Sequence, residues 1–501
     1  MALSNISNIG KGAIISYVSI FLNIIISFFY TPWMLNRIGA SDYGLYSLIN
    51  SFIAYFIIDF GLSSAIARFV AKYRAEGNNT KVENILGLTL RIFFAIDVVI
   101  FLCLFICYFF IADIFTGLTP AEIGRLKVLY IIASTFSLLS FGLKPLDGAL
   151  TAYEYFVPAK IIDMVYKVGS VLFVVIALLL GGNIYILVLI NGGLSFLTHL
   201  YRFIYWHKKT GLFPNLLFQD KTEARSIFSF SGWTFLIGMA QRFRLNLIPS
   251  VLGIFANSVE IAVFSLGMTM EAMTYTLSSA LNGLFLPMVS RLVYNDDQRG
   301  IMDLMIKVGR IQLFVVFAIF SGFFVCGQTF INLWVGETYS DVYYIVLCLI
   351  SSNIISNTLQ VATDKVYAEN KIKYTARVTF TTSLVGIVAS CCVAGKFGAV
   401  GCAACSGVAL VVSQICYMRI YKKRLDIDIA GFFRACHLRI MPLITIIASI
   451  FFLAFQYLNI KSWAGLIFGV GIYIIVYALV SYFFLFNEYE KSLVKTILRI
   501  K

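Results

Sequence analysis

Residues 92–112 read IFFAIDVVIFLCLFICYFFIA, a run in which Asp97 is the single charged side chain. Backbone N–H and C=O groups in hydrocarbon must be hydrogen-bonded within the segment, and about 20 apolar residues form a helix that crosses a bilayer. The run lacks the strict alternation of a barrel strand. It therefore predicts a transmembrane α-helix.

Similar runs recur along the whole chain of 501 residues, of which 60% are hydrophobic and 13% are charged. This is more apolar surface than a soluble fold buries. The sequence predicts an all-α polytopic membrane protein of about 14 transmembrane helices. The predicted spans are 12–36, 43–67, 86–115, 128–151, 158–181, 184–206, 227–254, 258–290, 308–334, 341–364, 376–395, 398–418, 440–458 and 463–486.

The formal charge of +14 comes from Lys and Arg residues in short polar gaps between the spans. They form no single basic face, so they indicate topology and no nucleic-acid partner. Alternate loops, including 72–81, 208–225 and 371–373, are the basic ones, and the positive-inside rule predicts that they are cytoplasmic. An even number of spans then predicts that both termini are cytoplasmic too.

Short internal similarities predict a repeat. Residues 44–48 align with 262–266, and residues 62–65 align with 277–280. Six spans in each unit would give two parallel six-helix repeats. The predicted domains are an N-terminal half at 1–218, a C-terminal half at 219–425, and two additional helices with a cytoplasmic tail at 426–501.

Charges deep in a span cost free energy unless they face a partner or a wet cavity, so they are the candidate functional residues. Arg242 and Arg244 lie near the middle of the span 227–254. Two residues on a helix are about 200° apart, so these arginines cannot both face one point. One of them is a candidate for a cavity-lining position.

Two further spans each carry a cation and a carboxylate at helical spacing. Lys144 and Asp147 are three residues apart, and Asp163 and Lys167 are four apart. Each pair is spaced to neutralise itself on one helix face. The alternative is that the lysines bind a substrate.

Asp97 and Glu271 have no such cation on their own helix, so each needs a partner on another helix, a proton, or a role in cation coupling. Asp59 and Arg68 are nine residues apart, which places them on opposite helix faces. They are further candidates for coupling or charge pairing, although Arg68 can also reach the cytoplasmic surface.

Other site chemistry is not indicated. Cys402 and Cys405 have metal-ligand spacing, but no second cluster or nearby His accompanies them, so they are interpreted as helix-packing residues. The sequence contains neither an acid–base constellation nor a phosphate-binding Gly-Lys-Ser/Thr loop. We therefore expect no enzyme activity, cofactor or metal.

The chain resembles the polysaccharide or O-antigen flippases, the Wzx-type branch of the multidrug/oligosaccharidyl-lipid/polysaccharide exporters. The resemblance rests on Thr31-Pro32 with residues 37–46, on 59–62, on 146–154 and on Gly232-Trp233. It covers roughly the whole chain in topology, and its motifs are concentrated in the first 155 residues.

The resemblance implies a flippase that moves an undecaprenyl-pyrophosphate-linked oligosaccharide across a bacterial inner membrane, together with a polysaccharide polymerase and a chain-length regulator as partners. Under this hypothesis the headgroup-binding candidates are Arg242, Arg244, Lys144 and Lys167. The alternatives are a multidrug/cation antiporter or a peptidoglycan-precursor flippase of the same superfamily. A membrane-embedded polysaccharide polymerase is a less favoured alternative.

Overall fold

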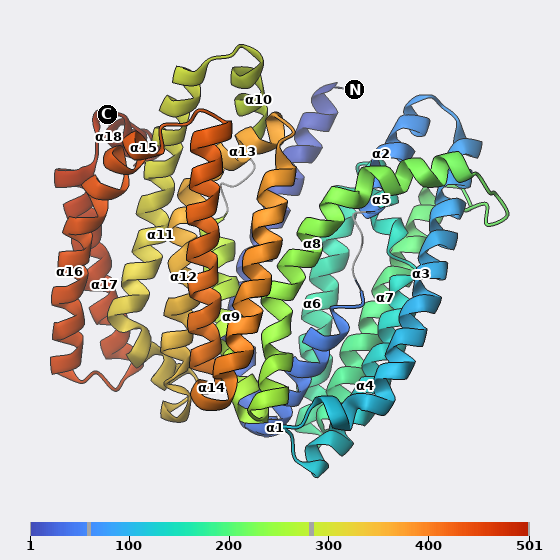
Figure 1. Cartoon of the computed structure of the whole chain (residues 1–501), viewed down its shortest axis with the longest axis horizontal. Coiled ribbons are helices and arrows are strands. Elements are labelled where there is room, and N and C mark those ends of the chain that lie inside the picture. The colour runs from blue at the N-terminus through green and yellow to red at the C-terminus, as the bar shows by residue number, and fades with distance from the viewer. Residues whose placement is uncertain (1, 58–61, 280–284, 499–501) are drawn as a thin grey trace. The chain divides into compact units, whose positions relative to one another are not determined.

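The computed structural model describes residues 2–57, 62–279 and 285–498, without the side chains of 2–17, 64, 226, 228–237, 240–242, 244–245 and 496–498. Within these ranges every regular element is a helix (Figure 1), which confirms the predicted fold class. Apart from residues 58–61 and 280–284, each predicted span lies on one helix or on two consecutive helices. Nine of the described helices are long and apolar enough to cross a membrane, or ten if the bent pair of Val342–Thr358 and Gln360–Ala368 counts as one.

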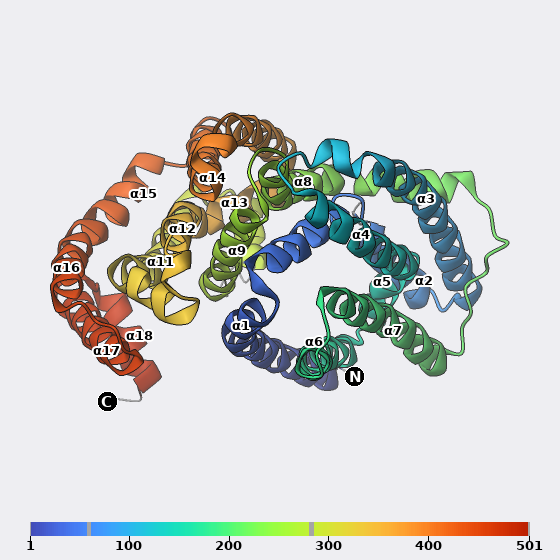
Figure 2. The same ribbon diagram turned by 90° about the horizontal axis from the view of Figure 1, so that it is seen from below.

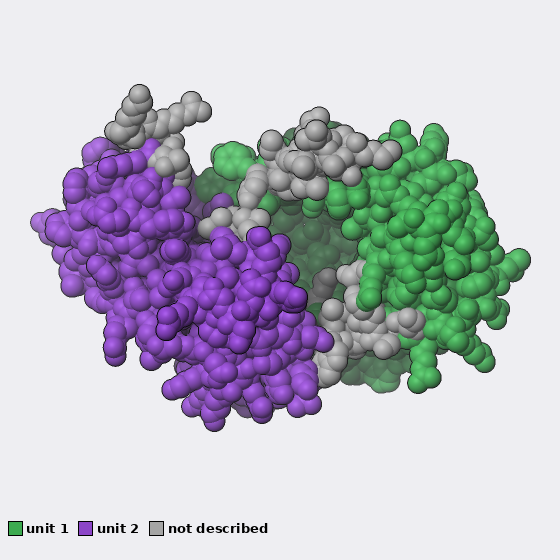
Figure 3. All heavy atoms as spheres, turned by 90° about the horizontal axis from the view of Figure 1, so that it is seen from above, with its two compact units in different colours: residues 1–262 green, residues 263–501 purple. Residues whose placement is uncertain are grey.

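The chain divides into two compact units, residues 1–262 and residues 263–501, which Figure 3 colours separately. In the first unit α7 packs against both α4 and α6, α1 also contacts α4 and α6, and α2 packs on α5 (Figure 2). The helices of this unit are α1 (Ala2–Ile53), α2 (Leu62–Ala75), α3 (Asn79–Ile114), α4 (Pro120–Phe141), α5 (Pro145–Ala152), α6 (Phe156–Leu179), α7 (Ile184–Thr210) and α8 (Lys221–Phe255). Helix α9 (Ser258–Ser278) begins in this unit and continues into the second.

Two glycines determine how α1 turns and packs. Gly39 has φ +82°, a left-handed conformation that breaks the helix between the predicted spans 12–36 and 43–67. At Gly44 a Cβ atom would lie 1.9 Å from the carbonyl oxygen of Ser258. Only glycine therefore lets α1 approach the first turn of α9 this closely.

In the second unit α11 is the central helix, because it contacts α12, α13, α16 and α17. Helix α14 contains a second glycine break, at Gly398 with φ +52°, which is the first residue of the predicted span 398–418. The helices of this unit are α10 (Leu286–Tyr294), α11 (Gln298–Trp334), the short η1 (Glu337–Tyr339), α12 (Val342–Thr358), α13 (Gln360–Ala368), α14 (Ile372–Arg424), α15 (Ile429–Ala435), α16 (His437–Leu458), α17 (Trp463–Val480), the π-helical turn η2 (Ser481–Leu485) and α18 (Glu488–Leu498).

The compact units and the predicted repeats are different divisions of the chain. Helix α8 belongs to the first unit because it packs on α1, α2 and α3. The repeat boundaries after residues 218 and 425 stay predictions.

Candidate substrate site in the N-terminal unit

The deep charges of the first unit meet at Arg202 of α7. The two terminal nitrogens of its guanidinium group donate separately to the carboxylates of Asp147 on α5 and Asp163 on α6. One helical turn away, the His199 Nε2 atom lies 4.0 Å from Asp147 Oδ2. The forked geometry of arginine suits such a double contact, and it ties three helices together.

The cluster lies well inside the helices. The rise per residue places Asp163 about 10 Å from the first residue of α6, and it places Arg202 about 12 Å from the last residue of α7. Both of these helix ends adjoin loops that the charge pattern predicts to be cytoplasmic. The Arg202 side chain is only 12% exposed. The Asp147 and Asp163 side chains are 34% and 47% exposed, so the cluster is a half-buried ionic site near the predicted cytoplasmic side.

Close backbone packing fixes Asp147 in this position. At Gly148 a Cβ atom would lie 2.5 Å from the carbonyl oxygen of Ser63, so α5 can approach α2 only with glycine there. This explains why Asp147-Gly148 occurs together in the motif 146–154: the first residue pairs with Arg202, and the second permits the packing.

The two predicted lysines flank the cluster. Arg202 binds both carboxylates for which the spacing suggested a lysine partner on the same helix. The Lys144 Nζ atom lies 5.6 Å from the centre of the Phe141 ring. Lys167 is partly buried one turn beyond Asp163 on α6. The sequence reasoning missed Arg202, although its position inside the predicted span 184–206 is the signal that identifies it.

The predicted lone carboxylates differ in their surroundings. The Oδ1 atom of Asp97 on α3 is buried without a hydrogen-bond partner. In the second unit the Glu271 side chain on α9 accepts a 3.4 Å hydrogen bond from the amide of Asn353 on α12. Arg68 lies on the exposed face of α2.

Three predicted site residues cannot be assigned a contact. Arg242 and Arg244 belong to the backbone of α8, but their side chains lie outside the described residues, and Asp59 lies outside them entirely. Their proposed roles stay predictions.

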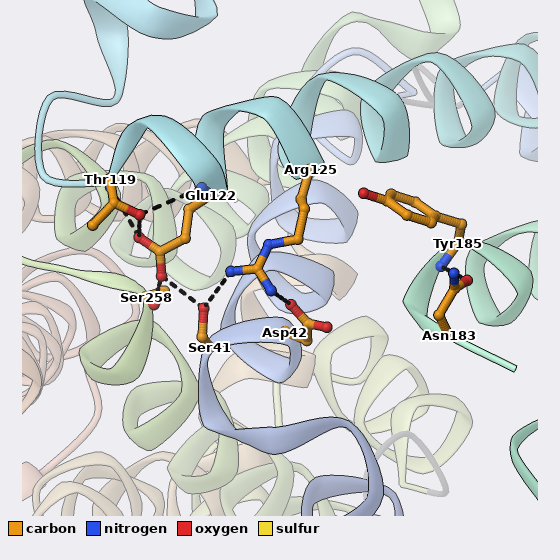
Figure 4. A network of polar contacts seen from close by, with 8 residues as sticks. All are labelled: Ser41, Asp42, Thr119, Glu122, Arg125, Asn183, Tyr185 and Ser258. Atoms are coloured by element: carbon orange, nitrogen blue, oxygen red, sulfur yellow. Dashed lines mark hydrogen bonds and ion pairs between the residues drawn. The ribbon is translucent and has the colours of Figure 1, made fainter. Parts of the chain in front are cut away.

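The motif 37–46 forms a polar network around the start of α4 (Figure 4). Glu122 accepts hydrogen bonds from the hydroxyls of Ser41, at 2.6 Å, and Ser258. Arg125 donates to Asp42 Oδ1 at 2.5 Å and to Ser41 Oγ at 3.3 Å. Every side chain in the network is engaged by another, so this part of the motif is a structural joint between α1, α4 and α9.

An apolar groove lies between α6 and α7, beside the cluster. It has a volume of about 580 Å³. Its wall includes Ile162 and Thr198, which are the chain neighbours of Asp163 and His199, and also Tyr201, next to Arg202. Asp163 and Arg202 do not line the groove themselves, so the ionic site and a groove without charged side chains lie on different faces of the same two helices.

Cys402 packs against the other half of α14. The Cys402 Sγ atom lies 3.8 Å from the carbonyl oxygen of Ser390 in the other half of α14. In the described part of the chain no group of three or more His, Cys, Asp or Glu residues is arranged to hold a metal ion.

Comparisons with known proteins agree on family and fold. Residues 9–294, more than half of the chain, match the family model described as polysaccharide biosynthesis protein. The chain is 22% identical to the uncharacterized membrane protein EpsK of Bacillus subtilis (strain 168), over 94% of each chain.

Solved structures give the fold. The chain is similar to the lipid II flippase MurJ in an inward closed conformation, with a TM-score of 0.73, 13% identity, and coverage of 98% of this chain and 99% of that one. It is also similar to an inward-facing multidrug resistance transporter of the MATE family, with a TM-score of 0.69, 11% identity, and coverage of 83% and 98%. At these identities the likeness concerns the fold alone.

Proposed function

Because the chain belongs to the polysaccharide biosynthesis protein family, we propose that this multi-pass membrane protein is a flippase for a lipid-linked oligosaccharide. In finer detail, the substrate is an undecaprenyl-pyrophosphate-linked repeat unit of an O-antigen or a related polysaccharide, and it crosses a bacterial inner membrane by alternating access driven by an ion gradient. Both termini are cytoplasmic, and a polysaccharide polymerase and a chain-length regulator act beside it.

One observation carries this proposal: α6 and α7 hold a half-buried ionic cluster and, on another face of the same two helices, an apolar groove. A lipid-linked sugar phosphate needs both environments, since its headgroup is anionic and its lipid is apolar. Arg202, Lys144 and Lys167 supply three cations against the carboxylates of Asp147 and Asp163, which leaves net positive charge for a phosphate.

Exchange of partners at Arg202 supplies a mechanism for binding and release. Without substrate, the guanidinium group is held by the two carboxylates. An arriving pyrophosphate offers the same forked acceptors with a higher charge, so it displaces one carboxylate. Because the displaced carboxylate then lacks a cation in a poorly hydrated site, it favours its protonated form. Substrate binding and proton uptake are thereby linked.

The test is transport by the purified full-length chain in proteoliposomes. A labelled polyprenyl-pyrophosphate oligosaccharide is placed in both leaflets, and a membrane-impermeant oxidant reports the sugar that reaches the outer one. We expect the protected fraction to disappear faster than in empty liposomes. A rate equal to that of empty liposomes contradicts the proposal, and a longer glycan product would indicate a polymerase instead.

A multidrug/cation antiporter is the second candidate, and the observation that favours it is the buried, unpartnered Oδ1 atom of Asp97. Such a carboxylate is suited to exchange a proton for a cation. In the same proteoliposomes, gradient-driven uptake of a fluorescent cationic drug without lipid transport would support the antiporter. A peptidoglycan-precursor flippase would transport lipid II in preference to other lipid-linked sugars.

A further inference from the structure

The segment that joins α7 to α8, residues 211–220, exposes three apolar side chains. It passes along the outer side of α3 in both Figure 1 and Figure 2. Phe213 is 57% exposed, Leu216 is 52% exposed and Leu217 is 88% exposed. The charge pattern predicts that this segment belongs to a cytoplasmic loop, in which side chains of this kind would meet water. Several large apolar side chains gathered on one surface indicate a contact with a partner.

The segment is held against α3 by its own backbone. The N–H group of Asn215 donates to the carbonyl oxygen of Glu83 at 3.0 Å, and the N–H group of Phe213 donates to the Glu83 carboxylate at 2.9 Å. The Asn215 amide also donates to the Asn84 side chain at 2.8 Å. At Gly87 a Cβ atom would lie 1.9 Å from the Asn215 carbonyl oxygen, so only glycine permits this approach. The exposed side chains are therefore presented by an ordered part of the fold.

These contacts bring the segment to the membrane border. Helix α3 begins at Asn79, and the helical rise places Arg91 about 18 Å from that end, well inside the predicted span 86–115. The Arg91 guanidinium group donates to the carbonyl oxygen of Phe218 at 3.4 Å. Residues 216–217 therefore lie at the level of the first turns of the span, where the acyl chains of the cytoplasmic leaflet begin.

Basic side chains lie on both sides of the apolar ones. Lys208 and Lys209 are in the last turn of α7, Lys221 is the first residue of α8, and all three are exposed. The carboxylate of Asp220 is engaged, because it caps α8 by accepting the N–H groups of Thr222 and Glu223. Cations next to apolar side chains at this level match anionic headgroups above acyl chains.

We propose that residues 211–220 form a membrane anchor: the exposed apolar side chains enter the cytoplasmic leaflet, and the flanking lysines bind anionic headgroups. A cytoplasmic protein would have to displace headgroups to reach side chains at this level, so the bilayer is the occupant that the position favours. The anchor keeps the beginning of α8 at the membrane surface. It goes beyond the proposed function, because it needs no lipid-linked sugar.

The test uses the photoreactive amino acid benzoylphenylalanine in place of Leu217, in the full-length chain. The protein is placed in nanodiscs that contain equal amounts of phosphatidylcholine and phosphatidylglycerol with identical acyl chains. After illumination, mass spectrometry identifies what is attached at position 217. We expect lipid adducts, because benzophenone reacts with C–H bonds that it touches and gives no stable adduct with water.

Tyr294 is the matched control position, at the end of α10 in another loop that is predicted to be cytoplasmic. It is 90% exposed, which is close to the value for Leu217, but Asn295, Asp296 and Asp297 follow it. Carboxylates are repelled by an anionic leaflet, so lipid adducts at position 217 should exceed those at position 294 by about fivefold or more.

The double variant Lys208→Gln/Lys209→Gln tests the choice of headgroup. With the lysines present, phosphatidylglycerol adducts at position 217 should exceed phosphatidylcholine adducts by about twofold or more. The double variant should lower this ratio, and so should a high salt concentration, which screens exposed charges. Both lysines are exposed, and thermal unfolding verifies that the variant is folded.

The anchor is overturned if position 217 yields no more lipid adduct than position 294. Adducts between position 217 and another protein chain, without lipid adducts, would show that a protein covers the surface and would also reject the membrane anchor. Equal amounts of the two lipid adducts in the presence of the lysines would overturn the binding of anionic headgroups.

Discussion

The ion pair between Arg310 of α11 and Glu490 of α18 should hold the C-terminal helix against the second unit. Arg310 is 2% exposed and Glu490 is 4% exposed. The Arg310 Nε atom donates to Glu490 Oε1 at 2.6 Å, and Nη2 donates to Oε2 at 2.9 Å. The guanidinium group also donates to the carbonyl oxygens of Leu485, at 2.8 Å, and Ala435, at 3.1 Å.

The loss of unfolding free energy when this ion pair is broken follows from the burial of both side chains. Arg310→Met leaves a carboxylate buried without its cation, and breaking such a pair costs about 3–5 kcal/mol of unfolding free energy. Glu490→Gln leaves the opposite charge unpaired and should cost a similar amount. The double variant Arg310→Met/Glu490→Leu buries no charge, so it should be at least about 2 kcal/mol more stable than either single variant. It does not fully recover, because the carbonyls of Leu485 and Ala435 lose their donor.

The assay is unfolding of the purified full-length chain, combined with trypsin cleavage after Lys491 and Lys495 as a measure of α18 release. Lys307→Met is the matched control, since this exposed side chain of α11 lies 5.5 Å from the ring of Tyr489 on α18. It should cost less than about 1 kcal/mol. The reasoning is refuted if Arg310→Met costs no more than this control, or if the double variant loses the sum of the single losses.

Three further outcomes are expected. Arg202→Gln should reduce the initial transport rate by about tenfold or more at near-normal protein abundance. Arg202→Lys should recover the rate only partly, because lysine lacks the forked donors of a guanidinium group. Full transport by both variants would show that the cluster takes no part in the mechanism. Gly44→Ala should lower the unfolding free energy by about 1–3 kcal/mol, because its Cβ atom would lie 1.9 Å from the Ser258 carbonyl oxygen. The control Gly124→Ala, with open space around its Cβ position, should raise it by about 0.5–1 kcal/mol in a thermal unfolding measurement. Under the antiporter alternative, Asp97→Asn should abolish gradient-driven uptake of the cationic drug, and an unchanged uptake would assign Asp97 no coupling role.

The helices were readable from the sequence to within a few residues, and the reason is local. The apolar run 92–112 lies within α3, the break at Gly39 falls in a predicted gap between spans, and the break at Gly398 falls one residue after another such gap. A membrane helix satisfies its backbone through hydrogen bonds four residues apart, so a window of about 20 residues contains the necessary information.

The side-chain contacts between helices were harder to predict from the sequence. The spacing of Asp147 and Asp163 suggested partners on their own helices, but both carboxylates bind Arg202 of α7. Arg125, near the start of α4, pairs with Asp42 of α1, a contact that the sequence pattern does not indicate. No local pattern indicates that Arg310 and Glu490, which are 180 residues apart, form one ion pair.

By itself, therefore, the sequence determined that the protein lies in a membrane, that its fold is all-helical, and where its helices are. The motifs at 37–46 and 146–154 also indicated the family that it resembles. The tertiary structure alone decided which charges meet and which side chains line a pocket. The physical reason is that these helices are apolar on nearly all sides, so hydropathy does not reveal which face turns inward. Side chains such as Arg202 and Arg310 acquire their partners from the rotation and register of helices that are distant in the chain.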